Sequence, residues 1–312
     1  MFHPENFPPE LLAGPFSIEL ANFLGVGPGR LKHADVLRLS RGIKAINIQD
    51  ASLALLTAPF TQVTGYSAAS HATAFTIWEF PGFLPGSDDN VIHISRQAPH
   101  DEPRRAGIHG HTTKFRDDEV FCLDGLWLTT RVRTWLDCSR RMSIEELVVV
   151  ADHLLRLPRP EFEDRTEPYA TLAELEQMLE RHKGTPGIQK ARQALTLARV
   201  GSDSAPETRL RLALADAGLP EPLINVPVAL AHGKSRTPDA QFPDYCVAVE
   251  YDGGTHNESE QVGRDILRQE DFQEAGWVEV RIGKIHMRDD AKAAVRKVRD
   301  ALYSRGWRPK KN

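Results

Sequence analysis

The sequence predicts an α/β protein in two parts. In the C-terminal third, helix and strand patterns alternate in the order helix, three strands, helix, strand, helix, which is typical of a sheet flanked by helices. Residues 157–170 (LPRPEFEDRTEPYA) combine three prolines with a cluster of acids and indicate a linker. The chain has 312 residues, enough for two domains that each bury a core.

Composition limits the class of protein. Lys and Arg total 39 and Asp and Glu total 43, giving a net charge of −4, and 41% of residues are hydrophobic. These values exclude a disordered chain, a collagen and a disulfide scaffold. Because the overall charge does not favour nucleic acid, DNA binding requires a local basic patch.

The cysteine pattern and the apolar runs predict a cytoplasmic protein. Cys122, Cys138 and Cys246 are widely spaced and form no CxxC pair, which argues against a zinc knuckle and favours a reducing compartment. The N-terminus lacks the basic and apolar regions of a signal peptide. Apolar runs such as 147–150 are far shorter than a membrane span, so we expect no membrane partner.

The N-terminal part begins with a pattern like a helix-turn-helix. A short amphipathic helix is expected over Ser17–Leu24, followed by a glycine-rich turn and a basic helix over Arg30–Leu39. A plain helical hairpin is the alternative. Farther along, Ser67–Thr76 reads as a helix. Strands are expected at 91–95, 120–123 and 126–130.

Capping boxes mark the helices that follow. In Ser143-x-x-Glu146 and Thr171-x-x-Glu174 the side chains can satisfy the first backbone N–H groups of a helix. They open helices over 144–156 and 171–182, and a third helix is expected over 188–200. The predicted organisation is therefore an N-terminal region (1–160), a helical linker (161–200) and a C-terminal domain (201–312).

The C-terminal domain has the sharpest pattern. Its predicted helices span about 206–217, 261–275 and 290–304. Its predicted strands span 224–230, 238–242, 246–252 and 277–282. A short turn at Pro243-Asp244 joins the second and third strands into a hairpin.

Four carboxylates gather around this hairpin. Glu250 and Asp252 lie two residues apart on one strand and therefore share a face, while Asp239 starts the partner strand. Glu207 lies in the first turn of the preceding helix. Acids this close repel one another unless they are solvated, protonated or bridged by a cation, and oxygen ligands suit Mg²⁺ or Mn²⁺. His256 could then act as a general acid or base, or as a ligand.

Structural alternatives accompany these candidates. Asp239 alone would be a strand-edge acid that faces water. Ser204-x-x-Glu207 is also a capping box, and Asp252-Gly253 is also a turn signal. His256 alone would be an ordinary loop histidine. His109-Gly-His111 is read as a surface strand because no further ligand accompanies the pair.

Basic residues supply the expected DNA contacts. Arg264 and Arg268 are one helical turn apart, and the closing helix places Lys292, Arg296 and Arg299 outward beside a buried apolar stripe. A solvated face is the alternative in both cases.

The segment 239–256 (DAQFPDYCVAVEYDGGTH) resembles the nuclease core of the PD-(D/E)xK superfamily, and most closely its very-short-patch-repair-like branch. The matching residues outside it are Glu207 in Ser204-Ala-Pro-Glu207, Asp265, Arg268, Trp277 and Arg281. The resemblance covers about 200–308. It implies a restriction-endonuclease-like mixed sheet and Mg²⁺-dependent cleavage of DNA, with Asp239, Glu250 and the backbone carbonyl of Tyr251 as metal ligands.

One position departs from that family pattern. Asp252 stands where the superfamily usually has a lysine, so another cation must substitute, or His256 activates water, or the site binds metal without cutting. The candidate cations are Lys234, Arg268 and Arg281.

The N-terminal region resembles, over shorter motifs, the antitoxin-like proteins of type IV abortive-infection systems. The motifs are YSAA (66–69), VIHIS (91–95), LWLTTR (126–131) and RTWLD (133–137). This resemblance implies a DNA-binding or regulatory region, with a toxin or a second copy of the chain as partner. Three hypotheses result: a Mg²⁺-dependent DNA endonuclease, a non-catalytic DNA-binding regulator with a degenerate nuclease fold, or a nuclease-like fold used only for protein contacts.

Overall fold

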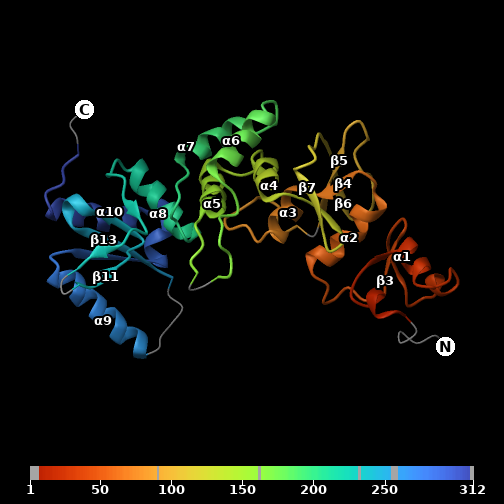
Figure 1. Cartoon of the computed structure of the whole chain (residues 1–312), viewed down its shortest axis with the longest axis horizontal. Coiled ribbons are helices and arrows are strands. Elements are labelled where there is room, and N and C mark those ends of the chain that lie inside the picture. The colour runs from red at the N-terminus through yellow and green to blue at the C-terminus, as the bar shows by residue number, and fades with distance from the viewer. Residues whose placement is uncertain (1–6, 90, 161–162, 231–232, 254–258, 310–312) are drawn as a thin grey trace. The chain divides into compact units, whose positions relative to one another are not determined.

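Two units make up the chain in the computed structural model (Figure 1). Unit 1 comprises Met1–Leu147 and Leu172–Arg192, and unit 2 comprises Val148–Thr171 and Gln193–Asn312. The structure describes residues 7–89, 91–160, 163–230, 233–253 and 259–309, without the side chains of 259–266. The division differs from the expected domains, because residues 148–160 belong to unit 2 and 172–192 to unit 1.

Unit 1 starts with a small three-stranded antiparallel sheet in the order β1-β3-β2. Its elements are η2 (Pro9–Leu11), β1 (Phe16–Ser17), α1 (Ile18–Phe23), η3 (Arg30–Lys32), β2 (Leu37–Ser40) and β3 (Ile43–Ala45). The Ser17 Oγ caps α1 by accepting the Leu20 N–H at 3.0 Å, so the first predicted helix is confirmed.

The prediction of a second helix, basic in character, over Arg30–Leu39 is wrong. The chain makes one 3-10 turn, and Arg30 then binds both oxygens of Asp35 at 2.7 and 2.6 Å. Gly42 has a φ of 79°, which allows a tight turn that pairs β2 with β3. Strand pairing has thus overridden helix propensity, and a helix followed by a β-hairpin replaces the helix-turn-helix.

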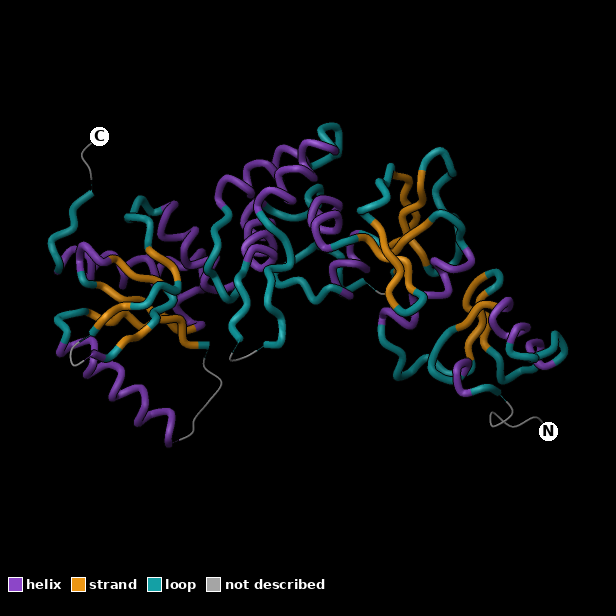
Figure 2. Tube along the Cα trace, viewed as in Figure 1, coloured by secondary structure: helices purple, strands orange, loops and turns teal. Residues whose placement is uncertain are grey.

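A five-stranded mixed sheet in the order β6-β5-β4-β8-β7 forms the rest of the unit 1 core (Figure 2). Its strands are β4 (Ser67–Ala69), β5 (Ile92–Gln97), β6 (Ile108–Thr113), β7 (Val120–Leu123) and β8 (Leu126–Thr129). The accompanying helices are α2 (Leu53–Val63), α3 (His71–Ile77) and α4 (Arg131–Cys138). The three expected strands are confirmed as β5, β7 and β8.

The helix expected over Ser67–Thr76 is only half right. Residues 67–69 form β4, which lies between β5 and β8, and α3 begins at His71. These three small residues are fully buried in the sheet, and this tertiary context outweighs their local preference.

Three helices follow the five-stranded sheet along the chain, and they confirm the helices expected over 144–156, 171–182 and 188–200. They are α5 (Ile144–Leu155), α6 (Leu172–Arg181) and α7 (Ile188–Leu197). The segment after α5 is more than a linker, since Glu163 binds Arg156 at 2.7 Å and Arg165 at 3.1 Å within unit 2.

Unit 2 is built on a four-stranded sheet in the order β14-β13-β12-β9. Its strands are β9 (Leu223–Ile224), β12 (Ala240–Phe242), β13 (Val247–Asp252) and β14 (Val278–Gly283). β12 is antiparallel to both neighbours, whereas β13 and β14 are parallel. The other elements are α8 (Ala205–Asp216), β10 (Val228–Ala229), β11 (Ser235–Arg236), η5 (Pro243–Tyr245), α9 (Ser259–Glu274), η6 (Lys284–Met287) and α10 (Arg288–Ser304).

Helices cover both faces of this sheet. Val247 and Val249 face α8 and α10 in one apolar cluster, while Ala248 faces Phe272 of α9 in another. The expected α/β alternation is therefore confirmed. Figure 1 shows α8 and α10 beside β13.

The prediction of a single strand at 224–230 is wrong. It is split into β9 and β10, which belong to different sheets. Between them Asn225 has a φ of 51°, and Pro227 has no N–H to donate. Among the described helices, none has the length and apolarity needed to cross a bilayer.

Candidate carboxylate site in unit 2

Three of the predicted acids lie at one end of the unit 2 sheet. β12 and β13 are antiparallel, with Ala240 opposite Val249, so Asp239 lies beside the end of β13. The Tyr251 N–H donates to the Asp239 Oδ2 at 2.6 Å. Glu250, on the face of β13 turned toward α9, forms an ion pair with Arg268 of that helix. The hairpin therefore brings Asp239 and Glu250 to the same end of the unit 2 sheet.

Glu207 reaches the same end from the start of α8. The Ser204 hydroxyl donates to its Oε1 at 2.7 Å, and the Asp203 N–H donates to its Oε2 at 2.9 Å. The Glu207 N–H donates back to the Ser204 Oγ at 3.5 Å. The capping role expected from the sequence is confirmed, and it holds the carboxylate in a fixed position.

Burial makes the negative charge at this site unfavourable. Burial raises the pKa of the Glu207 carboxyl, and the charge of Asp239 raises it further. Burial also raises the pKa of Asp239, against the opposing effects of the Tyr251 N–H and Arg268. A site that disfavours its own carboxylate charges is stabilised by a proton or by a bound cation.

Four further residues complete the site, and the sequence analysis missed them. The Arg159 guanidinium pairs with Asp203 and donates to the Asn225 Oδ1 at 2.9 Å. Asn225 in turn donates to the Glu207 Oε2 at 3.2 Å. Glu279 of β14 lies 3.5 Å from the Arg268 Nε. Arg159 lies in the proline-rich segment 157–170. The many charged residues of that segment indicated a linker, so nothing in the sequence marked Arg159 as part of a site.

The other predicted residues are distributed as follows. Asp252 is exposed at the end of β13. Lys234 binds Asp271 at 2.5 Å, and Arg281 binds Glu279 at 3.1 Å. Arg268, one of the three candidate cations, pairs with Glu250. His256 lies outside the described residues, as does the side chain of Arg264.

The closing helix α10 carries the expected basic face. Lys292 and Arg296 are exposed, and Val295, Val298 and Leu302 form the buried stripe. Arg299 differs from the expectation of an outward side chain, because it is half-buried and donates to the Ala217 carbonyl at 3.5 Å. That carbonyl follows the last turn of α8 and needs a donor.

The oxygen atoms at this end of the sheet suit a hard divalent cation. In the described part of the chain, no group of three or more His, Cys, Asp or Glu side chains is arranged to hold a metal. Mg²⁺, however, is commonly held by one or two carboxylates together with waters and substrate phosphates. Asp239, Glu250 and the Tyr251 carbonyl fit that donor chemistry, provided that Arg268 releases Glu250.

A second polar cluster lies in unit 1, and the sequence pointed to only two of its four residues, His109 and His111. We call it the histidine cluster: His71 of α3, His93 of β5, and His109 and His111 of β6. The His71 and His111 rings stack with centroids 3.8 Å apart, and the His93 Nδ1 lies 2.9 Å from the His111 Nε2. The strand predicted around His109 and His111 is confirmed as β6, but of these two histidines only His109 is exposed.

Burial lowers the pKa of the three inner histidines. The values fall to about 3 for His71, about 4 for His93 and about 3 for His111, and neighbouring histidines lower them further. Positive charge from Arg133 and Arg141 also lowers the pKa of His71. These rings are therefore neutral at pH 7. Because they stack face to face, this cluster is a packing feature of unit 1.

The fold and the site together define an α/β protein with a half-buried carboxylate cluster at one end of its C-terminal sheet. Two proteins of Mycobacterium tuberculosis match the chain: uncharacterized protein MT2308 of strain CDC 1551 / Oshkosh and uncharacterized protein Rv2248 of strain H37Rv. Each is 33% identical over 255 residues, covering 81% of this chain and 87% of the relative. The chain belongs to the family of these mycobacterial proteins.

Neither relative's name states an activity. No protein-family model matches the chain. No solved structure matches it either. The geometry of the site is therefore the basis for the function proposed below.

Proposed function

We propose that the chain is a Mg²⁺-dependent DNA endonuclease of the PD-(D/E)xK type, which hydrolyses phosphodiesters at the carboxylate site of unit 2. The observation that carries the proposal is the meeting of Asp239, Glu250 and Arg268 at the end of β13. The element order helix, strands, helix, strand supports it as well, because the resemblance in the sequence implies the same order.

Each side chain then has a defined task. Asp239 and Glu250, with the Tyr251 carbonyl, would hold Mg²⁺, which when bound neutralises charge on the scissile phosphate and acidifies a water. Glu207, fixed by Ser204, adds negative charge that strengthens cation binding. Arg268 lies where it can exchange its partner from Glu250 to a substrate phosphate, and so supplies the positive charge that Asp252 does not.

Basic side chains around the site would hold the DNA. Lys292 and Arg296 are exposed on α10 and form no ion pair within the described residues. Phosphate contacts of this kind position a duplex without reading its sequence. Arg264, Arg281, Arg299 and Lys234 remain predicted DNA contacts, His256 remains a predicted acid or base, and a cytoplasmic location, a toxin partner and a homodimer remain predictions.

A plasmid-nicking assay tests the proposal. With Mg²⁺ or Mn²⁺ the purified chain should nick plasmid or mismatched duplex, whereas Asp239→Ala and Glu250→Ala should not. Asp216→Ala is a matched control, because Asp216 is an exposed acid on α8 outside the site. Equal cleavage by all three variants, or no cleavage by the wild-type chain with either metal, would contradict the proposal.

A second candidate is a non-catalytic DNA-binding regulator. The observation that favours it is the Glu250–Arg268 ion pair, which already neutralises one proposed metal ligand. In that case a Glu250→Ala variant would bind DNA as tightly as the wild-type chain, and neither would bind Mn²⁺ at this site.

A further inference from the structure

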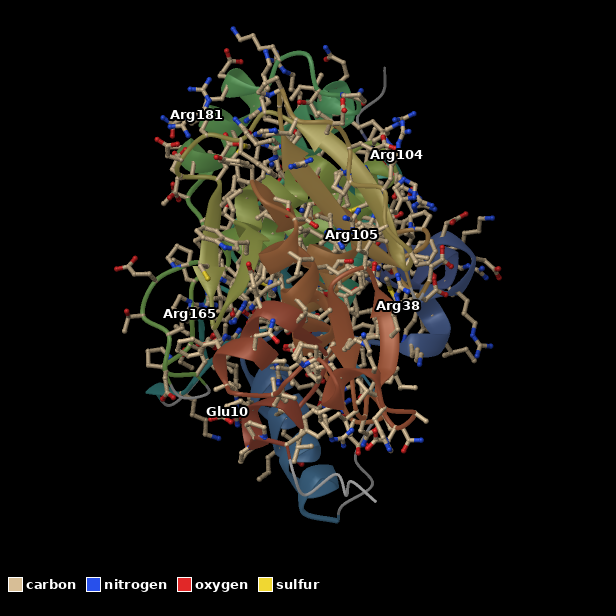
Figure 3. All side chains as sticks on the ribbon, turned by 90° about the vertical axis from the view of Figure 1, so that its right-hand side faces the viewer. Glu10, Arg38, Arg104, Arg105, Arg165 and Arg181 are labelled. Carbon is tan, nitrogen blue, oxygen red and sulfur yellow. The ribbon has the colours of Figure 1, made fainter. Side chains whose placement is uncertain are left out.

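Five arginines line one cleft in unit 1, away from the carboxylate residues along the chain. The cleft has a volume of about 610 Å³ and lies among the β2–β3 hairpin, β5 and residues 102–106. The arginines that line it are Arg38, Arg41, Arg96, Arg104 and Arg105. Figure 3 shows Arg38, Arg104 and Arg105 on one face of this unit. We refer to this feature as the arginine cleft.

The positive charge of the arginine cleft is not compensated within unit 1. Glu102 is the one acid among its lining residues, which leaves a formal charge of 5 − 1 = +4. None of the five arginines pairs with a carboxylate in the described part of the chain. Like charges held this close repel one another, and an anion in the cleft would relieve the repulsion.

Backbone carbonyls hold two of the guanidinium groups in place. Arg105 donates to the Arg41 carbonyl at 2.6 Å and to the Val63 carbonyl at 3.2 Å. Arg96 donates through its Nε to the Gly65 carbonyl at 3.0 Å. Burial lowers the pKa of Arg105, and the charges of Arg41 and Arg96 lower it further. The cleft thus presents pre-oriented guanidinium groups, which suit phosphate oxygens.

The shape of the surface favours a polymer over a single phosphate. A second hollow of about 500 Å³ shares Arg104 and Arg105 with the arginine cleft and continues to His109. The lining of the first hollow includes no aromatic ring on which a base could stack. Positive charge in a hollow whose own lining offers no ring for stacking is typical of contacts to the sugar–phosphate backbone.

We propose that the arginine cleft binds the phosphate backbone of duplex DNA, as a contact separate from the carboxylate site. The choice of DNA as the polymer rests on the proposed function, but the binding itself requires neither metal nor cleavage. In this arrangement unit 1 holds the duplex through the β2–β3 hairpin and residues 96–105. The hairpin that replaced the expected basic helix thereby supplies Arg38 and Arg41.

The test is a salt titration of duplex binding by fluorescence anisotropy, with EDTA present so that no cleavage occurs. The double variant Arg38→Ala/Arg104→Ala removes two exposed side chains that form no hydrogen bond or ion pair within the described residues. The control double variant Lys114→Ala/Arg140→Ala removes the same charge from exposed positions of unit 1 outside the cleft. Circular dichroism of both variants verifies that they are folded.

The expected result is a lower salt dependence in the cleft variant alone. Each lost phosphate contact should reduce the slope of log K against log salt by about 0.9, so two contacts reduce it by about 1.8. At 0.1 M salt this corresponds to about 60-fold weaker binding. An unchanged slope, or an equal reduction in the control, would overturn the proposal.

Competition with small phosphates distinguishes a polymer site from a phosphate site. Millimolar inorganic phosphate or ATP should leave duplex binding almost unchanged, since neither offers the spaced charges of a backbone. Displacement by either at an equal concentration of phosphate groups would overturn the assignment to DNA. Every measurement is made without metal, so a chain that lacks nuclease activity could still show DNA binding by the arginine cleft. Nuclease activity, in turn, would not by itself establish DNA binding by the cleft.

Discussion

Replacing Asp152 tests how α8, and with it Glu207, is held in unit 2. Asp152 lies on α5, and its residue surface is 1% exposed. Its Oδ1 accepts the Arg199 N–H at 2.7 Å, and its Oδ2 accepts the Thr208 hydroxyl at 2.9 Å and the Arg211 guanidinium at 2.8 Å. An Asp152→Ala substitution therefore leaves three donors without their acceptor.

The expected loss of stability is large because Arg211 is buried as well. Removing one member of a buried ion pair leaves an uncompensated charge and costs about 3–5 kcal/mol. For a domain of the size of unit 2, 1 kcal/mol shifts the melting temperature by about 2–4 °C. We therefore expect the melting temperature of unit 2 to fall by roughly 6–20 °C.

Thermal unfolding followed by circular dichroism measures the effect. The double variant Asp152→Leu/Arg211→Met should recover most of the loss, because it removes both charges together. The exposed Asp216→Ala variant should stay within about 0.5 kcal/mol of the wild-type chain. A loss below about 1 kcal/mol for Asp152→Ala would refute the reasoning, since it would mean that Arg211 finds solvent or another partner.

Three other predictions follow from the ionisable groups. The pKa values of the three inner histidines, His71, His93 and His111, are lowered, so their protonation opposes folding. The stability of unit 1 should therefore fall by about 1.4 kcal/mol per pH unit per inner histidine below pH 6.5 in acid titrations. The pKa of Asp239 is raised, so Asp239→Asn should raise the melting temperature at pH 7, with a difference that disappears on acidification, and should abolish nicking. Arg268→Ala should lower kcat by about 10²–10³-fold, with partial recovery in Arg268→Lys and a smaller loss in Arg281→Ala. A stability of unit 1 that does not change with pH would contradict the first prediction. A destabilised Asp239→Asn variant would contradict the second, and an unchanged kcat in Arg268→Ala would contradict the third.

Local periodicity explains which parts of the fold could be predicted. The period-two alternation of β13 places Val247 and Val249 in one core and Glu250 on the opposite face, as the sequence predicts. The capping boxes at Ser143 and Ser204 are equally local. Each of these features depends on residues a few positions apart, so no tertiary information is needed to recognise it.

The features that the sequence did not reveal are assembled from distant segments. The register of the parallel pair β5 and β6 places His93 beside His109, and no local pattern encodes that register. The arginine cleft likewise brings Arg38 of β2 together with Arg104 of the loop between β5 and β6. Arg159 reaches Asn225 from a segment whose composition indicates only a linker.

Diffraction from a Mn²⁺-soaked crystal tests the central claim most directly. The proposed function predicts an anomalous peak about 2.1 Å from a carboxylate oxygen of Asp239 and of Glu250, with Arg268 displaced from Glu250. A crystal in which Mn²⁺ leaves the Glu250–Arg268 ion pair intact and shows no peak at the end of β13 would contradict it.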